Sequence, residues 1–219
     1  MRLSLQRQGP SLRRPRRTTT PPRPPRPVRV ALTGGIGAGK SEALLAFGRH
    51  GAATVSSDEI VHHLLRRDEV RAAVVQRMGN GIVAPDGEID RGALATVVFN
   101  DREALTWLEE LLHPLVAHEY LEWRESLAKL SSPPAVCVTE VPLLYETGGD
   151  ARFDKVVVIT APEKLRRMRS TVAVDDRESR LIPDREKADR ADYVFKNLGS
   201  LDELDAFVAG VMDDLTSSR

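Results

Sequence analysis

Thr33-Gly34-Gly35-Ile36-Gly37-Ala38-Gly39-Lys40-Ser41 fits the pattern G-x-x-x-x-G-K-S/T, with Gly34, Gly39, Lys40 and Ser41 at its fixed positions. This pattern defines a P-loop. The mostly β-branched, apolar residues 28–32 before the loop predict a buried parallel strand, and residues 42–49 after it predict a helix. The strand–loop–helix context that the motif requires is therefore present.

The residue types in this loop suit the binding of a polyphosphate. Glycines let backbone N–H groups point inward, and the start of the helix adds partial positive charge. Lys40 would reach the β- and γ-phosphates, and the Ser41 hydroxyl would hold Mg²⁺. A glycine-rich turn with a chance lysine is the alternative, which the flanking elements disfavour. We predict an ATP and Mg²⁺ site formed by Gly35, Ile36, Gly37, Ala38, Gly39, Lys40, Ser41 and Glu42.

Further short strand patterns follow the P-loop, separated by helical patterns. They cover residues 52–55, 135–141, 155–160 and 193–195. Because right-handed crossovers join such strands into a parallel sheet, the ligands of this fold lie at the carboxyl ends of the strands. We expect an α/β, P-loop kinase-type three-layer fold with a five-stranded parallel sheet, a helical subdomain at about 62–128 and a lid at about 163–188.

Residues 1–27 differ from the rest of the chain. They contain eight arginines, seven of the fourteen prolines and no acidic residue, which predicts a disordered tail. An organelle transit peptide or a nucleic-acid-binding arm is the alternative, although so many prolines oppose an amphipathic helix. The tail has no apolar run of signal-peptide length, so we expect a cytoplasmic protein that contacts no membrane.

The remainder of the chain is acidic. It holds 24 basic and 32 acidic residues, a formal charge of −8, which argues against a general nucleic-acid binder. The one cysteine, Cys137, lies in an apolar run and predicts a buried structural thiol rather than a nucleophile.

Two carboxylates stand near the ends of predicted strands. Asp58 follows residues 52–55, where it could accept a proton or hold a hydroxyl group. An N-cap role for Ser57 or Asp58 explains the same position equally well. Glu140, near the end of 135–141, could act behind a metal through water or Ser41, and an exposed strand-end carboxylate is the alternative.

Asp101 predicts the start of a helix that Pro114 should break or restart. His113 would then lie at a junction between two helices, where a side chain can face a cleft, although a capping histidine is the alternative. The histidines lack metal-binding spacing, so we expect no zinc site. The aromatics Tyr120 and Trp123 favour a core position over a nucleotide-stacking face.

A cationic segment follows the strand at 155–160. Its basic residues stand among few large apolar ones, so the segment is too cationic to belong to the core. We predict a lid whose arginines approach the phosphates. A solvated helical face with pairs such as Glu163 and Arg167 is the alternative. We take Arg169 and Arg177 as candidate catalytic residues of a set that comprises Arg166, Arg167, Arg169, Arg177, Arg180, Arg185 and Lys187.

The order of these stretches resembles that of the dephospho-CoA kinases. A P-loop by itself indicates only nucleotide binding, whereas its Gly-Gly-Ile-Gly form, a His-Pro pair and a Pro-Leu-Leu-x-Glu run in this order are more specific. The resemblance covers about residues 28–214 and rests on residues 32–41, 57–58, 87–91, 113–114, 142–146 and 191–194.

This resemblance implies transfer of the ATP γ-phosphoryl group to the ribose 3′-hydroxyl of dephospho-coenzyme A, with Mg²⁺. It makes Asp58 the candidate base for that hydroxyl and residues 62–128 the acceptor-binding subdomain. Asn197 matches an asparagine that lies near the ATP adenine. The other residues that it places at the acceptor are Arg91, His113, Leu144 and Glu146.

The lid departs from the family pattern. Residues 170–176 are short for this segment, and Leu181 stands where the family has a glutamine, whereas Arg177, Pro183 and Lys187 match. Another small-molecule P-loop kinase, or a non-catalytic nucleotide-binding regulator, are the alternative functions. The intact Lys40, Ser41 and Asp58 disfavour the regulator, and the sequence leaves the oligomeric state open.

Overall fold

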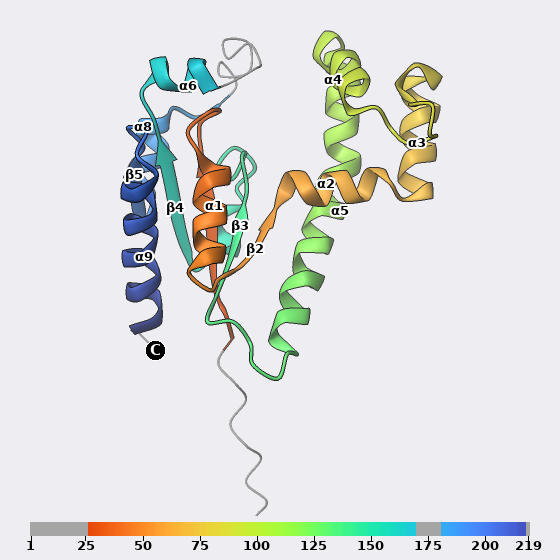
Figure 1. The fold of residues 1–219 in the computed structure, drawn as a ribbon. Helices are drawn as coiled ribbons and strands as arrows, with labels where there is room; N and C mark the ends of the chain where they lie inside the picture. Colours follow the sequence, from red (N-terminus) through yellow and green to blue (C-terminus); the bar gives the residue numbers. More distant parts are fainter. Residues whose placement is uncertain (1–25, 170–180, 218–219) are drawn as a thin grey trace, which may run out of the picture.

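A five-stranded parallel sheet forms the centre of the computed structural model, which describes residues 26–169 and 181–217 (Figure 1). Its spatial order is β2-β3-β1-β4-β5. The predicted α/β class and all five predicted strands are confirmed. The strands are β1 Val28–Gly34, β2 Ala53–Ser56, β3 Val136–Glu140, β4 Lys155–Thr160 and β5 Tyr193–Lys196.

Strand β1 lies in the middle of the sheet, with a buried strand on each side. It pairs with β3, where Leu32 is opposite Glu140, and with β4, where Gly34 is opposite Ile159. Such strands are covered on both faces, which is why they read as continuous apolar runs. The P-loop that follows β1 therefore lies at the centre of the carboxyl edge of the sheet, where parallel sheets bind ligands.

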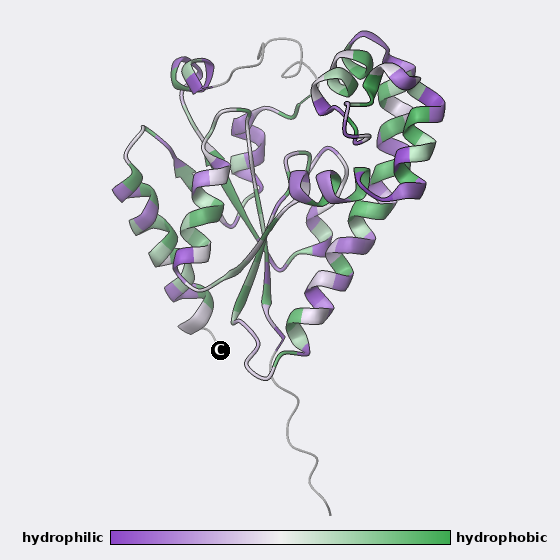
Figure 2. Cartoon of the chain, turned by 45° about the vertical axis from the view of Figure 1, so that its right-hand side comes forward, coloured by the Kyte–Doolittle hydropathy of each residue, from purple (hydrophilic) through white to green (hydrophobic). Residues whose placement is uncertain are grey.

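Helices cover both faces of the sheet, which Figure 2 shows nearly edge-on. Helices α1 (Lys40–Arg49) and α9 (Leu201–Ser217) pack on one face, where Phe47 and Val208 are completely buried. On the other face Ala31 and Val158 contact the segment after β3, together with the half-buried Ile182. Helix α6 (Glu163–Arg169) and helix α8 (Asp184–Asp189) lie near the P-loop end of the sheet (Figure 1).

A second hydrophobic cluster joins the helices between β2 and β3, to the right of the sheet in Figure 1. Leu64, Val74 and Ile82 are fully buried in it. Most of the cluster falls within residues 62–128, where the sequence predicts a helical subdomain, and Ile60 and Phe153 extend it beyond that range. Its elements are α2 Ser57–Leu65, α3 Asp68–Met78, α4 Arg91–Asn100 and α5 Arg102–Ala128, with a short 3-10 turn at Asn80–Ile82. A second 3-10 turn, Asp150–Arg152, precedes β4 outside this cluster.

The predicted break at Pro114 is wrong, because α5 continues through this residue for a total of 27 residues. Proline removes one backbone hydrogen bond and crowds the preceding turn. Leu108 and Leu112 before the proline and Tyr120 after it are all buried in the same cluster. Packing on both sides of Pro114 therefore holds the helix together despite the local cost.

Other local predictions are confirmed. The Asp101 carboxylate caps α5 by accepting hydrogen bonds from the N–H groups of Glu103 and Ala104. Cys137 is buried, and burial raises the pKa of its thiol to about 11, as expected of a structural thiol. Within residues 26–169 and 181–217, no helix combines the length and apolar character needed to cross a bilayer.

We expect Pro114→Ala to raise the free energy of unfolding by about 1–3 kcal/mol, because alanine restores the missing helical hydrogen bond. Urea denaturation measures the change. Pro142→Ala is the matched control: Pro142 lies outside the helices, so its replacement should not stabilise. A less stable Pro114→Ala protein would show that the packing of α5 depends on the geometry that proline imposes.

Candidate active site

The backbone of the P-loop passes so close to neighbouring elements that side chains do not fit. A Cβ atom at Gly34, where φ is 145°, would overlap the carbonyl of Ile159 in β4. A Cβ at Gly39, where φ is 102°, would overlap the Asn197 amide. Both positions require glycine for its left-handed backbone and for the close approach. The spacing of glycines in the motif is thus fixed by the sheet beneath it.

Asn197 holds the P-loop in place from the end of β5. Its Nδ2 donates a hydrogen bond to the carbonyl oxygen of Ala38 at 2.9 Å, and its Oδ1 accepts one from the N–H of Gly199 at 2.9 Å. The residue is 6% exposed. The family resemblance places this asparagine near the adenine, whereas its contacts in the structure are with the backbone of two loops.

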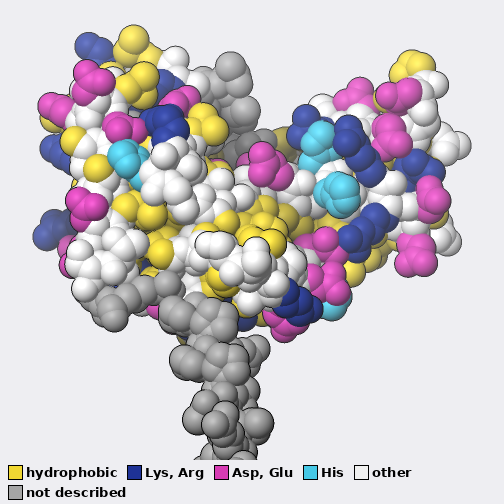
Figure 3. All heavy atoms as spheres, turned by 60° about the horizontal axis from the view of Figure 1, so that its bottom comes forward, with side chains coloured by type: hydrophobic (Ala, Val, Ile, Leu, Met, Phe, Trp, Pro, Cys, Tyr) yellow, Lys and Arg dark blue, Asp and Glu magenta, His cyan; other side chains and the backbone are white. Residues whose placement is uncertain are grey.

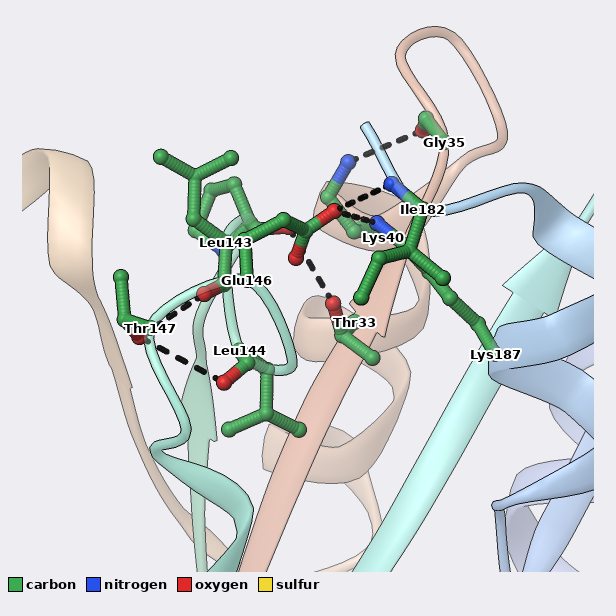
Figure 4. A network of polar contacts seen from close by, with 10 residues as sticks. Thr33, Gly35, Lys40, Leu143, Leu144, Glu146, Thr147, Ile182 and Lys187 are labelled. Atoms are coloured by element: carbon green, nitrogen blue, oxygen red, sulfur yellow. Dashed lines mark hydrogen bonds and ion pairs between the residues drawn. The ribbon is translucent and has the colours of Figure 1, made fainter. Parts of the chain in front are cut away.

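Lys40 begins α1, and its Nζ donates to the Gly35 carbonyl at 3.0 Å (Figure 4). Burial lowers the pKa of Lys40, and the carboxylates of Glu140 and Asp58 oppose this shift. Burial also raises the pKa of Glu140, which is 6% exposed at the end of β3, and the Lys40 charge opposes that shift. Opposite charges are thus held together beside the P-loop.

Asp58 is the second residue of α2, and neither predicted N-cap is correct. The N-cap is Ser56, whose hydroxyl accepts from the Asp58 N–H at 3.2 Å, while Glu59 accepts from the Ser56 N–H at 3.3 Å. These two reciprocal hydrogen bonds satisfy the backbone N–H groups of Asp58 and Ser56 at the helix start, so neither the Ser57 side chain nor the Asp58 carboxylate is needed as a cap. That carboxylate is exposed and forms no hydrogen bond with the described residues, so it is available to a substrate.

A cavity of about 450 Å³ lies between α2, α5 and the segment after β3. Three sequence candidates, Asp58, His113 and Leu144, line it. Most of the remaining wall is apolar and includes Val61 and Val141. A mostly apolar cavity with a few polar groups is the usual form of a small-molecule site.

Arg91 lies elsewhere, at the start of α4, and does not line the cavity. The pKa of His62 is lowered, first by partial removal from water and second by the positive charge of Arg91. Arg91 therefore lies close enough to His62 to interact with it. The right-hand part of the face in Figure 3, which α2–α5 form, carries histidine and basic side chains interspersed with acidic ones. Arg91 is therefore a cation near His62 in a helical region that is acidic as a whole, since residues 57–128 hold 7 arginines, no lysine and 14 acidic residues.

Glu146 points toward Ile182 and Lys187, at the end of the cationic segment (Figure 4), and it does not line the cavity. Its Oε1 accepts a hydrogen bond from the N–H of Ile182 at 3.0 Å and lies 2.8 Å from Lys187 Nζ. The Lys187 side chain is 0% exposed. The prediction that the cations of this segment are excluded from the core is thus wrong for Lys187, since the carboxylate of Glu146 makes its burial tolerable.

Helix α6 and the start of α8 lie against the P-loop. A Cβ at Gly35 would lie 2.9 Å from Asp184 Oδ1 and 3.1 Å from Arg166 Nη1, and a Cβ at Gly37 would lie 2.7 Å from the Arg166 carbonyl oxygen. Asp184 was not a sequence candidate, and Arg166 was one of many cations. Only their three-dimensional proximity to the glycines distinguishes them.

Of the two arginines predicted to be catalytic, Arg169 lies near the P-loop. Its Nη1 would be 4.0 Å from a Cβ at Gly39, and its Nη2 would be 3.5 Å from one at Gly199. Arg177 lies outside the described residues. The structure thus brings Arg169, Lys40 and Asn197 to the same end of the sheet.

The residues at the start of α1 suit a magnesium ion. Mg²⁺ in nucleotide sites takes one or two protein oxygens and completes its shell with phosphate and water. Ser41 and Glu42 are exposed in the first turn of α1, and the buried Glu140 supplies a nearby carboxylate. The described residues contain no group of three or more His, Cys, Asp or Glu side chains arranged to hold a metal, which such a site does not need.

The central β1, the glycine-restricted loop and the adjoining Lys40 define a P-loop kinase-type α/β protein. A family model described as dephospho-CoA kinase matches residues 28–203. The dephospho-CoA kinase of Protochlamydia amoebophila is 39% identical over 184 residues, which is 80% of this chain and 90% of its own. That of Aquifex aeolicus is 35% identical over 195 residues, covering 86% and 97%. The chain belongs to the dephospho-CoA kinase family.

Solved structures agree with this assignment. A crystal structure of a protein from Thermus thermophilus is 30% identical, with a TM-score of 0.70 over 87% of this chain and 99% of its own. The dephospho-CoA kinase from Campylobacter jejuni is 26% identical, with a TM-score of 0.60 over 85% and 96%. The similarity extends over the sheet and the helical region together.

The buried pair of Glu146 and Lys187 yields a stability prediction. We expect Glu146→Gln and Lys187→Met each to lower the free energy of unfolding by about 3 kcal/mol, because each leaves one charge buried without its partner. The double variant should lose less than the sum of the two. Urea unfolding of the four proteins gives the coupling energy.

Glu103→Gln is the matched control, since Glu103 pairs with Arg77 at an exposed site. It should change the free energy of unfolding by no more than about 0.5 kcal/mol. Additive losses in the Glu146 and Lys187 variants would contradict the inferred ion pair.

Proposed function

We propose that the chain transfers the γ-phosphoryl group of ATP to the ribose 3′-hydroxyl of dephospho-coenzyme A, giving coenzyme A and ADP. One observation carries the proposal: Asp58 both interacts with the charge of Lys40 at the P-loop and lines the adjoining cavity. A phosphate donor on one side and an acceptor hydroxyl on the other would meet at this carboxylate. Family membership supports both substrates.

In this proposal Asp58 accepts the proton of the 3′-hydroxyl as the oxygen attacks the γ-phosphorus. The bond between that phosphorus and the bridging oxygen of ADP breaks as the new one forms. Lys40 and the backbone N–H groups of the P-loop hold the β- and γ-phosphates. Arg169 faces the transferring group, with Arg177 as a second candidate beyond the described residues. Phosphoryl transfer depends mainly on such positioning and charge.

The proposal includes Mg²⁺, which supplies charge neutralisation between the phosphates when bound. The Ser41 hydroxyl would hold it, and Glu140 would act behind it through water. The buried position of Glu140 beside Lys40 supports this role. Asn197 contributes by fixing the loop that binds the phosphates.

We assign the acceptor to the cavity, with His113 and Leu144 in its wall. Arg91 lies outside the cavity, at the start of α4, where its guanidinium would bind a phosphate group of the acceptor. Glu146 would act indirectly, because it is engaged with Lys187 while Leu144 lines the cavity. A cytoplasmic location without nucleic-acid or membrane partners belongs to the same proposal, supported by the formal charge of −8 of residues 28–219, which hold 24 basic and 32 acidic residues.

We expect Lys40→Ala to lower the turnover of dephospho-coenzyme A with Mg-ATP by about 10²-fold or more, because a phosphate-binding cation is lost. Asp58→Asn should lower kcat by about 10²-fold, the scale of a positioned proton acceptor. A coupled assay of ADP release measures both. Lys129→Ala, at the exposed end of α5, is the control and should retain full activity.

Normal turnover by Lys40→Ala would reject the assignment of the phosphate site. If Asp58→Asn raises only the KM for the acceptor, Asp58 orients the hydroxyl instead of accepting its proton. Turnover of other small-molecule acceptors in preference to dephospho-coenzyme A would reject the substrate.

A further inference from the structure

Two charged side chains from distant elements meet at Gly35 of the P-loop. A Cβ atom at this glycine would lie 2.9 Å from Asp184 Oδ1 and 3.1 Å from Arg166 Nη1. Gly35 is not among the glycines with a left-handed backbone, so these side chains, rather than its φ angle, exclude a larger residue. A carboxylate beside a loop that binds phosphates requires a physical reason, because the two repel each other.

Backbone packing fixes Arg166 against the loop. Its Cα and carbonyl oxygen would lie 3.1 Å and 2.7 Å from a Cβ at Gly37, so the backbone of α6 rests directly on the P-loop. Arg169 stands three residues further along α6 and therefore shares a face of the helix with Arg166. Arg169 approaches the loop at Gly39, whereas Arg166 approaches it at Gly35. The two guanidiniums thus bracket the loop from one helix face.

The position of Arg166 is on the γ-phosphate side of this bracket. Lys40 Nζ donates a hydrogen bond to the Gly35 carbonyl oxygen at 3.0 Å, and Lys40 is the residue that reaches the β- and γ-phosphates in the proposed function. The Arg166 guanidinium therefore lies at the same residue as the Lys40 ammonium. A guanidinium has five N–H donors in a planar fork, so it can bind a carboxylate and a phosphate together.

The position of Asp184 is fixed by the buried ion pair at the start of α8. Glu146 accepts a hydrogen bond from the Ile182 N–H and lies 2.8 Å from Lys187 Nζ, on either side of Asp184 in the chain (Figure 4). The Asp184 charge also acts at the phosphate site. Burial lowers the pKa of Lys40, and Asp184 is one of the carboxylates that oppose this shift.

We propose that Arg166 binds the γ-phosphate of ATP and that Asp184 is the positioning residue that orients the Arg166 guanidinium at Gly35. This inference rests on the proposed function. Arg166 would donate N–H groups to the γ-phosphate oxygens while the bond to ADP breaks and the bond to the acceptor oxygen forms. Asp184 would hold the guanidinium in one orientation, so less side-chain entropy is lost when the phosphate binds.

The first experiment is a calorimetric titration of the wild type and Arg166→Ala with Mg-ATP and with Mg-ADP. The variant should raise the Kd of Mg-ATP by about 10-fold, the scale of a hydrogen bond between charged groups, and leave the Kd of Mg-ADP unchanged. Retained ADP binding also shows that the loop is intact. Arg167→Ala is the matched control, because Arg167 pairs with Glu163 on the exposed side of α6 and its loss should change neither Kd. Equal weakening of both nucleotides by Arg166→Ala, or of neither, would overturn the proposal.

Asp184→Asn tests the positioning role through the sign of its effect. Removal of a carboxylate that only repels phosphates would tighten the binding of both nucleotides. If Asp184 orients Arg166, the Kd of Mg-ATP should instead rise by about 3-fold, and the same change should cause no further loss in the Arg166→Ala protein. Glu186→Gln, an exposed acid of the same helix, is the control and should have no effect. Tighter ATP binding by Asp184→Asn, or a 3-fold loss that persists without Arg166, would contradict the positioning role.

Kinetics with dephospho-coenzyme A give an independent readout. Arg166→Ala should lower kcat by about 10²-fold, and Arg166→Lys should restore little of it, because lysine lacks the planar fork. An unchanged kcat for Arg166→Ala would overturn the proposal. The titrations require no acceptor, so they decide the role of Arg166 separately, whereas absence of wild-type turnover with dephospho-coenzyme A would refute the proposed function.

Discussion

The close passage of the P-loop backbone over its neighbours is the constraint on which the rest of the site depends. Gly34 lies against the carbonyl of Ile159, and Gly39 lies against the amide of Asn197. These contacts exist because β1 is central, with β4 on one side and the chain after β5 beyond it. A loop fixed in this way presents its N–H groups without having to reorganise when phosphates bind, which is the basis of electrostatic preorganisation.

Charged groups around this loop are held at a cost to stability. Burial raises the pKa of Glu140 and lowers that of Lys40, so both charged forms are disfavoured by desolvation. For Glu140 the sign follows directly: its contribution to stability is largest below its unfolded-state pKa and declines as the pH rises through its raised folded-state pKa. Such opposed shifts in neighbouring groups are typical of functional sites.

The sequence predicted those features that local residue patterns determine. Apolar runs located all five strands, and the motif located the phosphate site with its flanking helix. Features that depend on contacts between distant segments were missed. Pro114 was expected to break a helix that packing on both sides holds together. The burial of Lys187 depends on Glu146 from another loop, and the cavity that Asp58, His113 and Leu144 line depends on how α2 and α5 lie beside the segment after β3.

Calorimetric titration of Asn197→Ala with Mg-ATP and with magnesium tripolyphosphate tests the central claim most directly, since Asn197 bonds to the P-loop carbonyl of Ala38. If Asn197 shapes the phosphate site, the Kd of both ligands should rise by a similar factor of about 10, the value of one buried hydrogen bond to the loop. A rise for ATP alone, with unchanged affinity for tripolyphosphate, would show that Asn197 serves the base and would contradict the account.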